Sequence, residues 1–215
     1  MPGRRFFADR EDGGRWLAEE LVRRTWAAPL VLGLARGGVP VAAVVARRLA
    51  AELDVAVARK IGAPGHREFG VGAVTADGPA IYDEAILRAL KLSAARMSRA
   101  ENRERAEARR RLERYRDGRS PIGLTGRDVI LVDDGLATGV TATAALRDVR
   151  AGNPRTVVFA TPVGAPGAAS ALRREADDVV CVAEPPDFRA VGQWYADFRQ
   201  TSDEDVLDLL SGAGR

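Results

Sequence analysis

Short runs of consecutive apolar residues alternate along the chain with longer segments in which apolar residues recur at helical spacing. Continuous apolar runs are typical of strands in a sheet covered on both faces, and the segments between them predict amphipathic helices. The predicted strands are residues 30–35, 54–61, 129–132, 156–161 and 179–183. Because strands that alternate with helices need crossover connections, the pattern predicts an α/β fold with an open, mainly parallel sheet and helices on both faces.

The predicted helices begin and end at capping residues, prolines and glycines. They are residues 9–26, 39–52, 83–90, 93–116, 141–150 and 165–175, followed by a short helix capped by Ser202. Trp16 and Leu17 belong to the predicted apolar face of the first helix. Residues 62–72 are rich in Gly, Pro and charge and predict a mobile loop, with a short strand at 72–76.

These elements predict one core with appendages. Residues 28–184 form the predicted core, into which the helical segment 83–116 is inserted. Residues 1–27 and 185–215 lie outside it, and we expect them to form a small hood over the core. No internal repeat is apparent.

Length and composition agree with this organisation. The chain has 215 residues and a mass of 23.0 kDa, with 46% hydrophobic and 29% charged residues, as in an ordinary globular domain with an appendage. Its apolar runs are far shorter than the roughly 20 residues needed to cross a bilayer. Residues 1–9 do not resemble a secretory signal. We therefore expect no membrane contact and a cytoplasmic location.

The chain has a single cysteine, Cys181, and a single histidine, His66. Together they leave no ligand set for a structural zinc site, so a catalytic metal would need oxygen ligands. Cys181 lies in an apolar run, which predicts a small buried side chain rather than a nucleophile. An incidental His66 is favoured over a catalytic one.

The formal net charge of +3 mildly favours acidic or phosphorylated partners. Residues 93–119 concentrate positive charge, with ten arginines, four glutamates and one aspartate. Because the acids are interleaved with the arginines, a solvated helix is favoured over a nucleic-acid-binding face. We therefore expect small-molecule partners rather than nucleic acid.

Two adjacent carboxylates, Asp133 and Asp134, follow the predicted strand 129–132, and a loop of small residues then leads into a helix. Glycine in such a loop lets the backbone approach a ligand, and the N–H groups of a helix N-terminus favour a phosphate. The carboxylates would repel that phosphate, so we expect their partner to be a pair of hydroxyls or a cation. The alternative is that Asp134-Gly135 is a hairpin turn and Thr138-Gly139 an ordinary helix cap.

Residues 129–141 read Val-Ile-Leu-Val-Asp-Asp-Gly-Leu-Ala-Thr-Gly-Val-Thr. This segment closely resembles the phosphoribosyl pyrophosphate (PRPP) signature of type I phosphoribosyltransferases, and departs from it at Val140, where glycine is common. The resemblance implies the fold of that family, Mg²⁺ as cofactor, and transfer of ribose 5-phosphate from PRPP to a nucleobase with release of pyrophosphate, purine-like bases being favoured.

The same resemblance assigns residues to the parts of PRPP. It implies that Asp133 and Asp134 hold the ribose 2- and 3-hydroxyls and contact any Mg²⁺ that PRPP brings. The residues implied for the 5-phosphate are Ala137, Thr138, Gly139, Val140 and Thr141.

A second segment, Leu34-Ala35-Arg36-Gly37-Gly38-Val39-Pro40, resembles the pyrophosphate loop of the same family. The residues implied for pyrophosphate are Ala35, Arg36, Gly37 and Gly38, with a non-proline cis peptide between the first two. Lys60, at the end of the next predicted strand, resembles a basic residue that neutralises pyrophosphate; the alternative is a solvated lysine. Arg36, Lys60 and the acidic pair would then meet at the carboxyl ends of parallel strands, where open α/β sheets bind ligands.

Residues 186–195 loosely resemble the hood segment in which an aromatic ring stacks on a purine base, and Phe188 is the candidate ring. The alternative is that Phe188, Trp194, Tyr195 and Phe198 form a small hydrophobic cluster under a cap. Two rival functions also stay open, a PRPP-sensing regulator without turnover and a hydrolase or phosphorylase of phosphorylated ribosides. A homo-oligomer is compatible with all of these functions.

Overall fold

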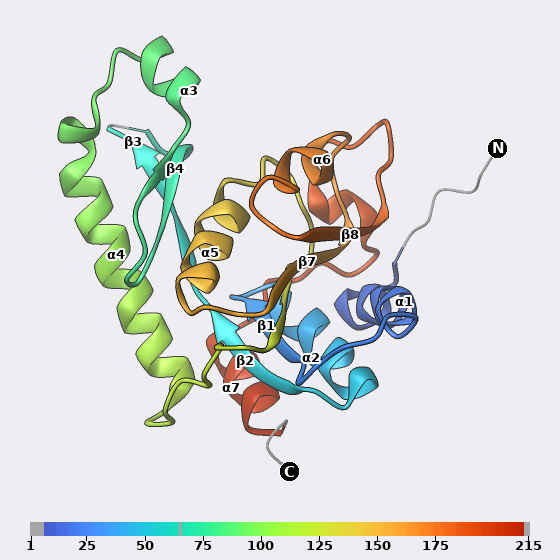
Figure 1. Cartoon of the computed structure of the whole chain (residues 1–215). Coiled ribbons are helices and arrows are strands. Elements are labelled where there is room, and N and C mark those ends of the chain that lie inside the picture. The colour runs from blue at the N-terminus through green and yellow to red at the C-terminus, as the bar shows by residue number, and fades with distance from the viewer. Residues whose placement is uncertain (1–6, 65, 213–215) are drawn as a thin grey trace.

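The computed structural model describes residues 7–64 and 66–212 of the chain. A five-stranded sheet in the order β2-β1-β6-β7-β8 forms its centre (Figure 1). Its strands are β1 (Leu30–Leu34), β2 (Glu52–Ala56), β6 (Asp128–Val132), β7 (Thr156–Val163) and β8 (Asp178–Ala183). All neighbouring pairs run parallel, so the predicted parallel α/β sheet is confirmed.

Helices cover both faces of this sheet. One face packs against α1 (Arg10–Leu21), α2 (Gly38–Leu49) and α7 (Asp203–Gly212), and the other against α5 (Val140–Ala151) and α6 (Ala168–Leu172). Successive residues of β6 alternate between the two cores, since Ile130 faces the α2 side and Leu131 faces the α5 side. Every residue of β1 and β6 is buried, which explains the apolar runs at 30–34 and 129–132. Asp128, the first residue of β6, is a buried carboxylate paired with Arg155.

A three-stranded antiparallel sheet lies between α5 and the long helix α4 (Ala94–Arg116) (Figure 1). Its strands are β3 (Ala58–Ala63), β4 (His66–Thr75) and β5 (Ile81–Tyr82). The prediction of a single strand over 54–61 is therefore wrong. The chain leaves the parallel sheet after Ala56 and enters the second sheet at Ala58, because the apolar run serves two different cores.

The prediction of a mobile loop over 62–72 is also wrong for most of its described residues, because residues 62–63 belong to β3 and residues 66–72 to β4, and the two strands pair. Residue 65 lies outside the described residues. Ile61, Val71 and Val74 pack with Met97 of α4 in a core of their own. One of the glycines that suggested a loop, Gly72, instead allows close packing, because a side chain there would overlap the backbone of β5.

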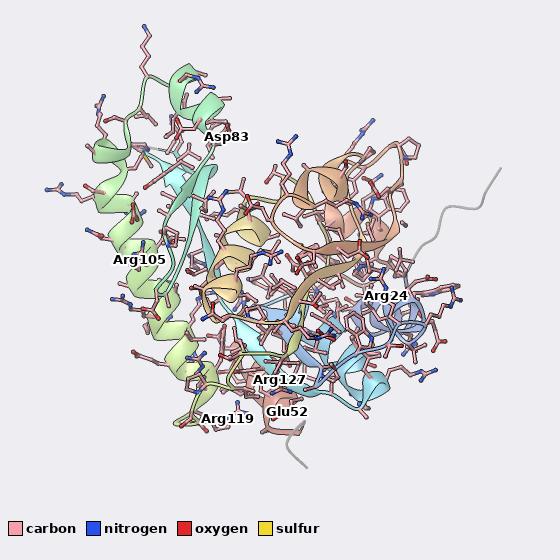
Figure 2. All side chains as sticks on the ribbon, in the orientation of Figure 1. Arg24, Glu52, Asp83, Arg105, Arg119 and Arg127 are labelled. Carbon is pink, nitrogen blue, oxygen red and sulfur yellow. The ribbon has the colours of Figure 1, made fainter. Side chains whose placement is uncertain are left out.

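The helices predicted over 83–90 and 93–116 are confirmed as α3 (Glu84–Ala89) and α4. Their insertion into the core stays a prediction. Arg105 of α4, labelled in Figure 2, reaches the turn after β4, where its Nη1 donates to the Gly78 carbonyl at 2.6 Å. The acids of α4 pair with arginines: Arg105 Nη2 lies 2.9 Å from Glu101, and Glu107 pairs with two further arginines of the same helix. This neutralisation agrees with the predicted solvated helix.

Phe7, the first described residue, meets residues 194–196 beside β7 and β8. The Phe7 N–H donates to the Trp194 carbonyl at 2.9 Å, and the Phe7 ring centroid lies 5.4 Å from that of Tyr195. Trp194 ends the short 3₁₀ helix η1 (Val191–Trp194). α7 begins after Ser202, as predicted, and the Ser202 Oγ accepts the Asp205 N–H at 3.0 Å. The division into core and hood stays a prediction.

Three smaller expectations need comment. Trp16 is 48% exposed, so its place on the buried face of α1 is wrong; α1 instead approaches α2 through Gly14, where a side chain would meet Val44. α6 is shorter than the predicted helix over 165–175, since it begins after Gly167, which has a φ of 77°, and is followed by turns. None of the helices among the described residues is long and apolar enough to span a membrane.

Candidate functional site

The loops that follow β1 and β6 lie against each other, because these two strands are neighbours in the sheet. A side chain at Gly37 would overlap the Asp134 carboxylate, and one at Gly38 would overlap the Val132 carbonyl and approach the Asp133 Cα to 2.9 Å. Only glycine fits at such close approaches. The loop predicted to bind pyrophosphate therefore packs directly on the acidic pair.

A non-proline cis peptide joins Ala35 to Arg36, as predicted. Backbone hydrogen bonds hold this loop on both sides. The Ala35 N–H donates to the Ala56 carbonyl at 2.8 Å, and the Val39 N–H donates to the Arg36 carbonyl at 3.1 Å. The loop is thus fixed between β2 and the start of α2.

Side chains of α1 and of residues 195–198 surround Asp134. Arg10 Nε donates to Asp134 Oδ2 at 2.8 Å, and the two side chains are only 12% and 14% exposed. The same guanidinium lies 4.0 Å from the centre of the Phe198 ring. The Tyr195 hydroxyl donates to the Asp134 carbonyl at 2.6 Å. One carboxylate of the pair is therefore engaged with the protein itself.

Asp133 forms no comparable ion pair with the residues that the structure describes. Its Oδ1 accepts the Asp134 N–H at 2.9 Å. Burial, followed by repulsion from the Asp134 carboxylate, raises the pKa of Asp133 well above the ordinary value. Burial also raises the pKa of Asp134, although Arg10 opposes that shift. Of the two acids, Asp133 is the one whose charge still needs a partner.

The predicted phosphate loop leads from β6 into α5. Leu136 anchors it, because its N–H donates to the Val163 carbonyl at 2.8 Å and its carbonyl accepts the Ala165 N–H at 2.7 Å. Gly139 precedes the first residue of α5 and has a φ of 78°. The exposed residues of the loop are Ala137 and Thr138, and the half-buried ones are Gly139, Val140 and Thr141. The helix N-terminus is thus open to an anion, and the alternative of a hairpin turn is excluded.

Arg36 follows β1, the strand next to the one that carries the acidic pair, but its guanidinium turns to α7. Its Nη1 is 3.5 Å from Asp203 Oδ1, and the side chains are 22% and 16% exposed. Lys60 is an exposed residue of β3, beyond the last residue of β2, so its predicted place at the end of a parallel strand is wrong. The reason is the same departure of the chain from the parallel sheet after Ala56.

Phe188 is half-buried and packs against the cluster of Phe7, Val163, Trp194 and Tyr195. Phe188 is therefore part of a hydrophobic cluster with other aromatic residues, as the alternative interpretation expects. Cys181 is half-buried, and burial raises the pKa of its thiol to about 12, which agrees with the expectation that it is no nucleophile.

A family model described as a phosphoribosyl transferase domain matches residues 8–199. The chain belongs to this family. The protein named "Putative phosphoribosyl transferase Rv0571c" of Mycobacterium tuberculosis H37Rv is 46% identical over 211 residues, which cover 98% of this chain and 48% of that protein. The chain thus spans about half the length of the curated relatives it matches.

Solved structures agree on the fold. The crystal structure of TT1426 from Thermus thermophilus superimposes with a TM-score of 0.80 at 47% identity, over 95% of this chain and 97% of that one. A hypothetical protein from Neisseria gonorrhoeae with bound ppGpp has a TM-score of 0.50 at 13% identity, over 100% of this chain and 99% of that one. At that identity the second likeness shows the fold alone.

The residues of the site fit a metal that arrives with its substrate. Among residues 7–64 and 66–212 no group of three or more His, Cys, Asp or Glu side chains could hold a metal ion. Mg²⁺ commonly binds through one or two carboxylates together with substrate phosphates and water. The Asp133 carboxylate, beside the phosphate loop, fits that donor set.

Three residues of the site escape sequence reasoning. Arg10, Tyr195 and Asp203 each contact a predicted site residue, yet they lie in the terminal segments. Arg10 is one of 31 arginines, and nothing in its neighbours along the chain marks it. Tyr195 lies in the segment that resembles a hood, which is the only signal that could have pointed to it.

Proposed function

We propose that this phosphoribosyl transferase moves ribose 5-phosphate from PRPP to a nitrogen of a nucleobase, with purine-like bases favoured, and releases pyrophosphate. One observation carries the proposal: the loop with Arg36, Gly37 and Gly38 packs on the acidic pair at the end of β6, beside the open N-terminus of α5. The segments proposed for the 5-phosphate, the ribose diol and the leaving group are thus neighbours, which supports the proposal.

In this proposal the 5-phosphate lies at the start of α5. The N–H groups of residues 137–141 and the hydroxyls of Thr138 and Thr141 would donate to it, and the helix dipole favours its charge. Val140 is compatible with this role because only its N–H is needed. Asp133 would accept the ribose hydroxyls. Asp134, paired with Arg10, would hold the Arg36 loop in position, since its carboxylate lies against Gly37.

The reaction forms a bond between the base nitrogen and the ribose C1 and breaks the bond from C1 to the pyrophosphate oxygen. That oxygen leaves with the electron pair, and the base loses a proton. Because positive charge grows on the ribose and negative charge on the leaving group, catalysis rests on positioning and electrostatic stabilisation. Arg36 would take up the negative charge. Mg²⁺ bound with PRPP would neutralise part of the pyrophosphate charge.

The acceptor base is proposed to lie beneath the segments that join Phe7 to Tyr195. Phe188 is the proposed stacking ring. Its partners in the aromatic cluster would hold the ring in place, so the part of it that stays accessible could cover one face of a planar base.

The test is release of pyrophosphate from PRPP in the presence of Mg²⁺, measured over a panel of purine and pyrimidine bases. We expect release that depends on one class of base and yields the matching nucleotide. Changing both acids, Asp133→Asn with Asp134→Asn, should abolish productive PRPP binding in a folded protein. Binding of PRPP without release for any base would indicate a regulator, and release without any base would indicate a hydrolase; either result would overturn the proposal.

A further inference from the structure

Arg36 is tied to a residue that neither the motif nor the predicted loop contains. Its Nη1 lies 3.5 Å from Oδ1 of Asp203, the first residue of α7. The distance describes an ion pair that leaves most of the guanidinium free to donate, since arginine carries five N–H donors. Both side chains are largely shielded from water, which strengthens the pairing.

Asp203 is itself held by the inserted helix α4. The Tyr115 hydroxyl donates to Asp203 Oδ1 at 2.6 Å, and Arg114 Nη1 donates to Oδ2 at 2.7 Å. Tyr115 is completely buried. The hydrogen bond from Tyr115, followed by the charges of Arg114 and Arg36, lowers the pKa of Asp203. Asp203 is therefore a fixed carboxylate.

Hydrogen bonds also join the C-terminal end of α4 to the C-terminal part of α7. Arg119, labelled in Figure 2, follows α4; its Nη1 donates to the Leu210 carbonyl at 3.1 Å and its Nη2 to the Tyr115 carbonyl at 2.9 Å. α7 packs on α2, the helix that begins at the end of the Arg36 loop. The contact between Asp203 and Arg36 therefore joins three elements that are far apart in the sequence.

We propose that Asp203 is a positioning residue that holds one edge of the Arg36 guanidinium so that its remaining N–H groups meet the pyrophosphate of PRPP. The inserted helix α4 then helps to set the geometry of the leaving-group side through Tyr115. The inference rests on the proposed function, because it needs Arg36 to bind pyrophosphate. A pre-positioned guanidinium binds better because less side-chain freedom is lost on binding.

The experiment is a double-mutant cycle read by calorimetry with two probes, pyrophosphate with Mg²⁺ and ribose 5-phosphate. Arg36→Ala, Asp203→Asn and the double variant are compared with the unchanged protein. We expect Asp203→Asn to weaken pyrophosphate about 5- to 10-fold and ribose 5-phosphate less than twofold, as for an interaction worth about one decade or less. In the Arg36→Ala background the same change should have less than a twofold effect.

Two further variants separate positioning from folding. Tyr115→Phe removes only the hydroxyl that holds Asp203, and should weaken pyrophosphate two- to threefold. Glu204→Gln is the matched control, because Glu204 is the neighbour of Asp203 and pairs with Arg114 at 2.7 Å without contacting Arg36. It should leave both affinities unchanged.

The inference is overturned if Asp203→Asn leaves pyrophosphate affinity unchanged, if the loss persists undiminished without Arg36, or if ribose 5-phosphate weakens equally. If Arg36→Ala itself fails to weaken pyrophosphate, the role of Arg36 in the proposed function falls as well. If Arg36→Ala weakens it and Asp203→Asn does not, only the inference falls.

Discussion

At the scale of single residues, the two adjacent acids of the motif have different surroundings. Asp134 pairs with Arg10. For Asp133, burial and the neighbouring Asp134 charge both disfavour the charged carboxylate and raise its pKa. A carboxyl whose pKa is raised by folding binds its proton more tightly in the folded state than in the unfolded one. The free energy of unfolding then falls as the pH rises through the raised pKa, because the folded state must hold an unfavourable charge.

We therefore expect Asp133→Asn to raise the melting temperature at pH 7–8 by a few degrees, equivalent to about 1 kcal/mol, while it abolishes PRPP binding. Measured by calorimetry without Mg²⁺ or PRPP, the difference from the unchanged protein should shrink as the pH is lowered towards 4. Asp134→Asn should raise the melting temperature less than Asp133→Asn, since Arg10 offsets part of the cost of the Asp134 charge and loses its ionic partner in the variant. Equal shifts for the two variants would refute this division.

At the scale of elements, two loops after neighbouring strands make the candidate site, and a glycine permits their contact. Gly38 begins α2 and lies against the carbonyl of Val132 and the Cα of Asp133. Both neighbours are backbone atoms, so they cannot move aside as a flexible side chain could. The position of the Arg36 loop therefore depends on the absence of a side chain at Gly38.

We predict that Gly38→Ala displaces this loop at a cost of about 1–3 kcal/mol and weakens PRPP at least tenfold, while the far-ultraviolet circular dichroism stays unchanged. Gly123→Ala is the control, since a side chain there would meet nothing within 4 Å. Calorimetric titration with PRPP compares the two. Retention of full affinity by Gly38→Ala would show that the loop tolerates the movement.

At the scale of the whole molecule, two segments far apart in the sequence contact Asp134. The Phe7 N–H donates to the Trp194 carbonyl, Tyr195 donates to the Asp134 carbonyl, and Arg10 pairs with the Asp134 carboxylate. The start of the described chain and residues 194–195 are thus joined to each other and to the end of β6.

We expect Tyr195→Phe to cost about 1 kcal/mol, since it removes one hydrogen bond and keeps the ring, and to weaken PRPP two- to fivefold. Tyr82→Phe is the matched control: the hydroxyl of Tyr82, in β5, donates to Glu101 of α4 at 2.8 Å. Thermal unfolding should show similar losses for both variants, and PRPP titration a change for Tyr195→Phe alone. A comparable loss of PRPP affinity in both would argue against a link through Asp134.

The sequence by itself determined the parallel sheet, the long helix of the insertion and the segments of the acidic pair and the Arg36 loop. These are local properties: a strand buried on both faces reads as an apolar run, and a phosphate loop needs small residues next to a helix N-terminus. Residues 129–141 carry all of this within one segment, which is why their strand, loop and helix were predictable.

Only the tertiary structure decided where the chain leaves the parallel sheet after Ala56 and which residues complete the site. A change of sheet depends on which core each residue enters, and Ile61 is apolar in either case. Arg10, Tyr195 and Asp203 reach the site across long separations in sequence, through contacts that no local pattern encodes. The physical reason is that an ion pair or a hydrogen bond depends on distance in space, which folding alone creates.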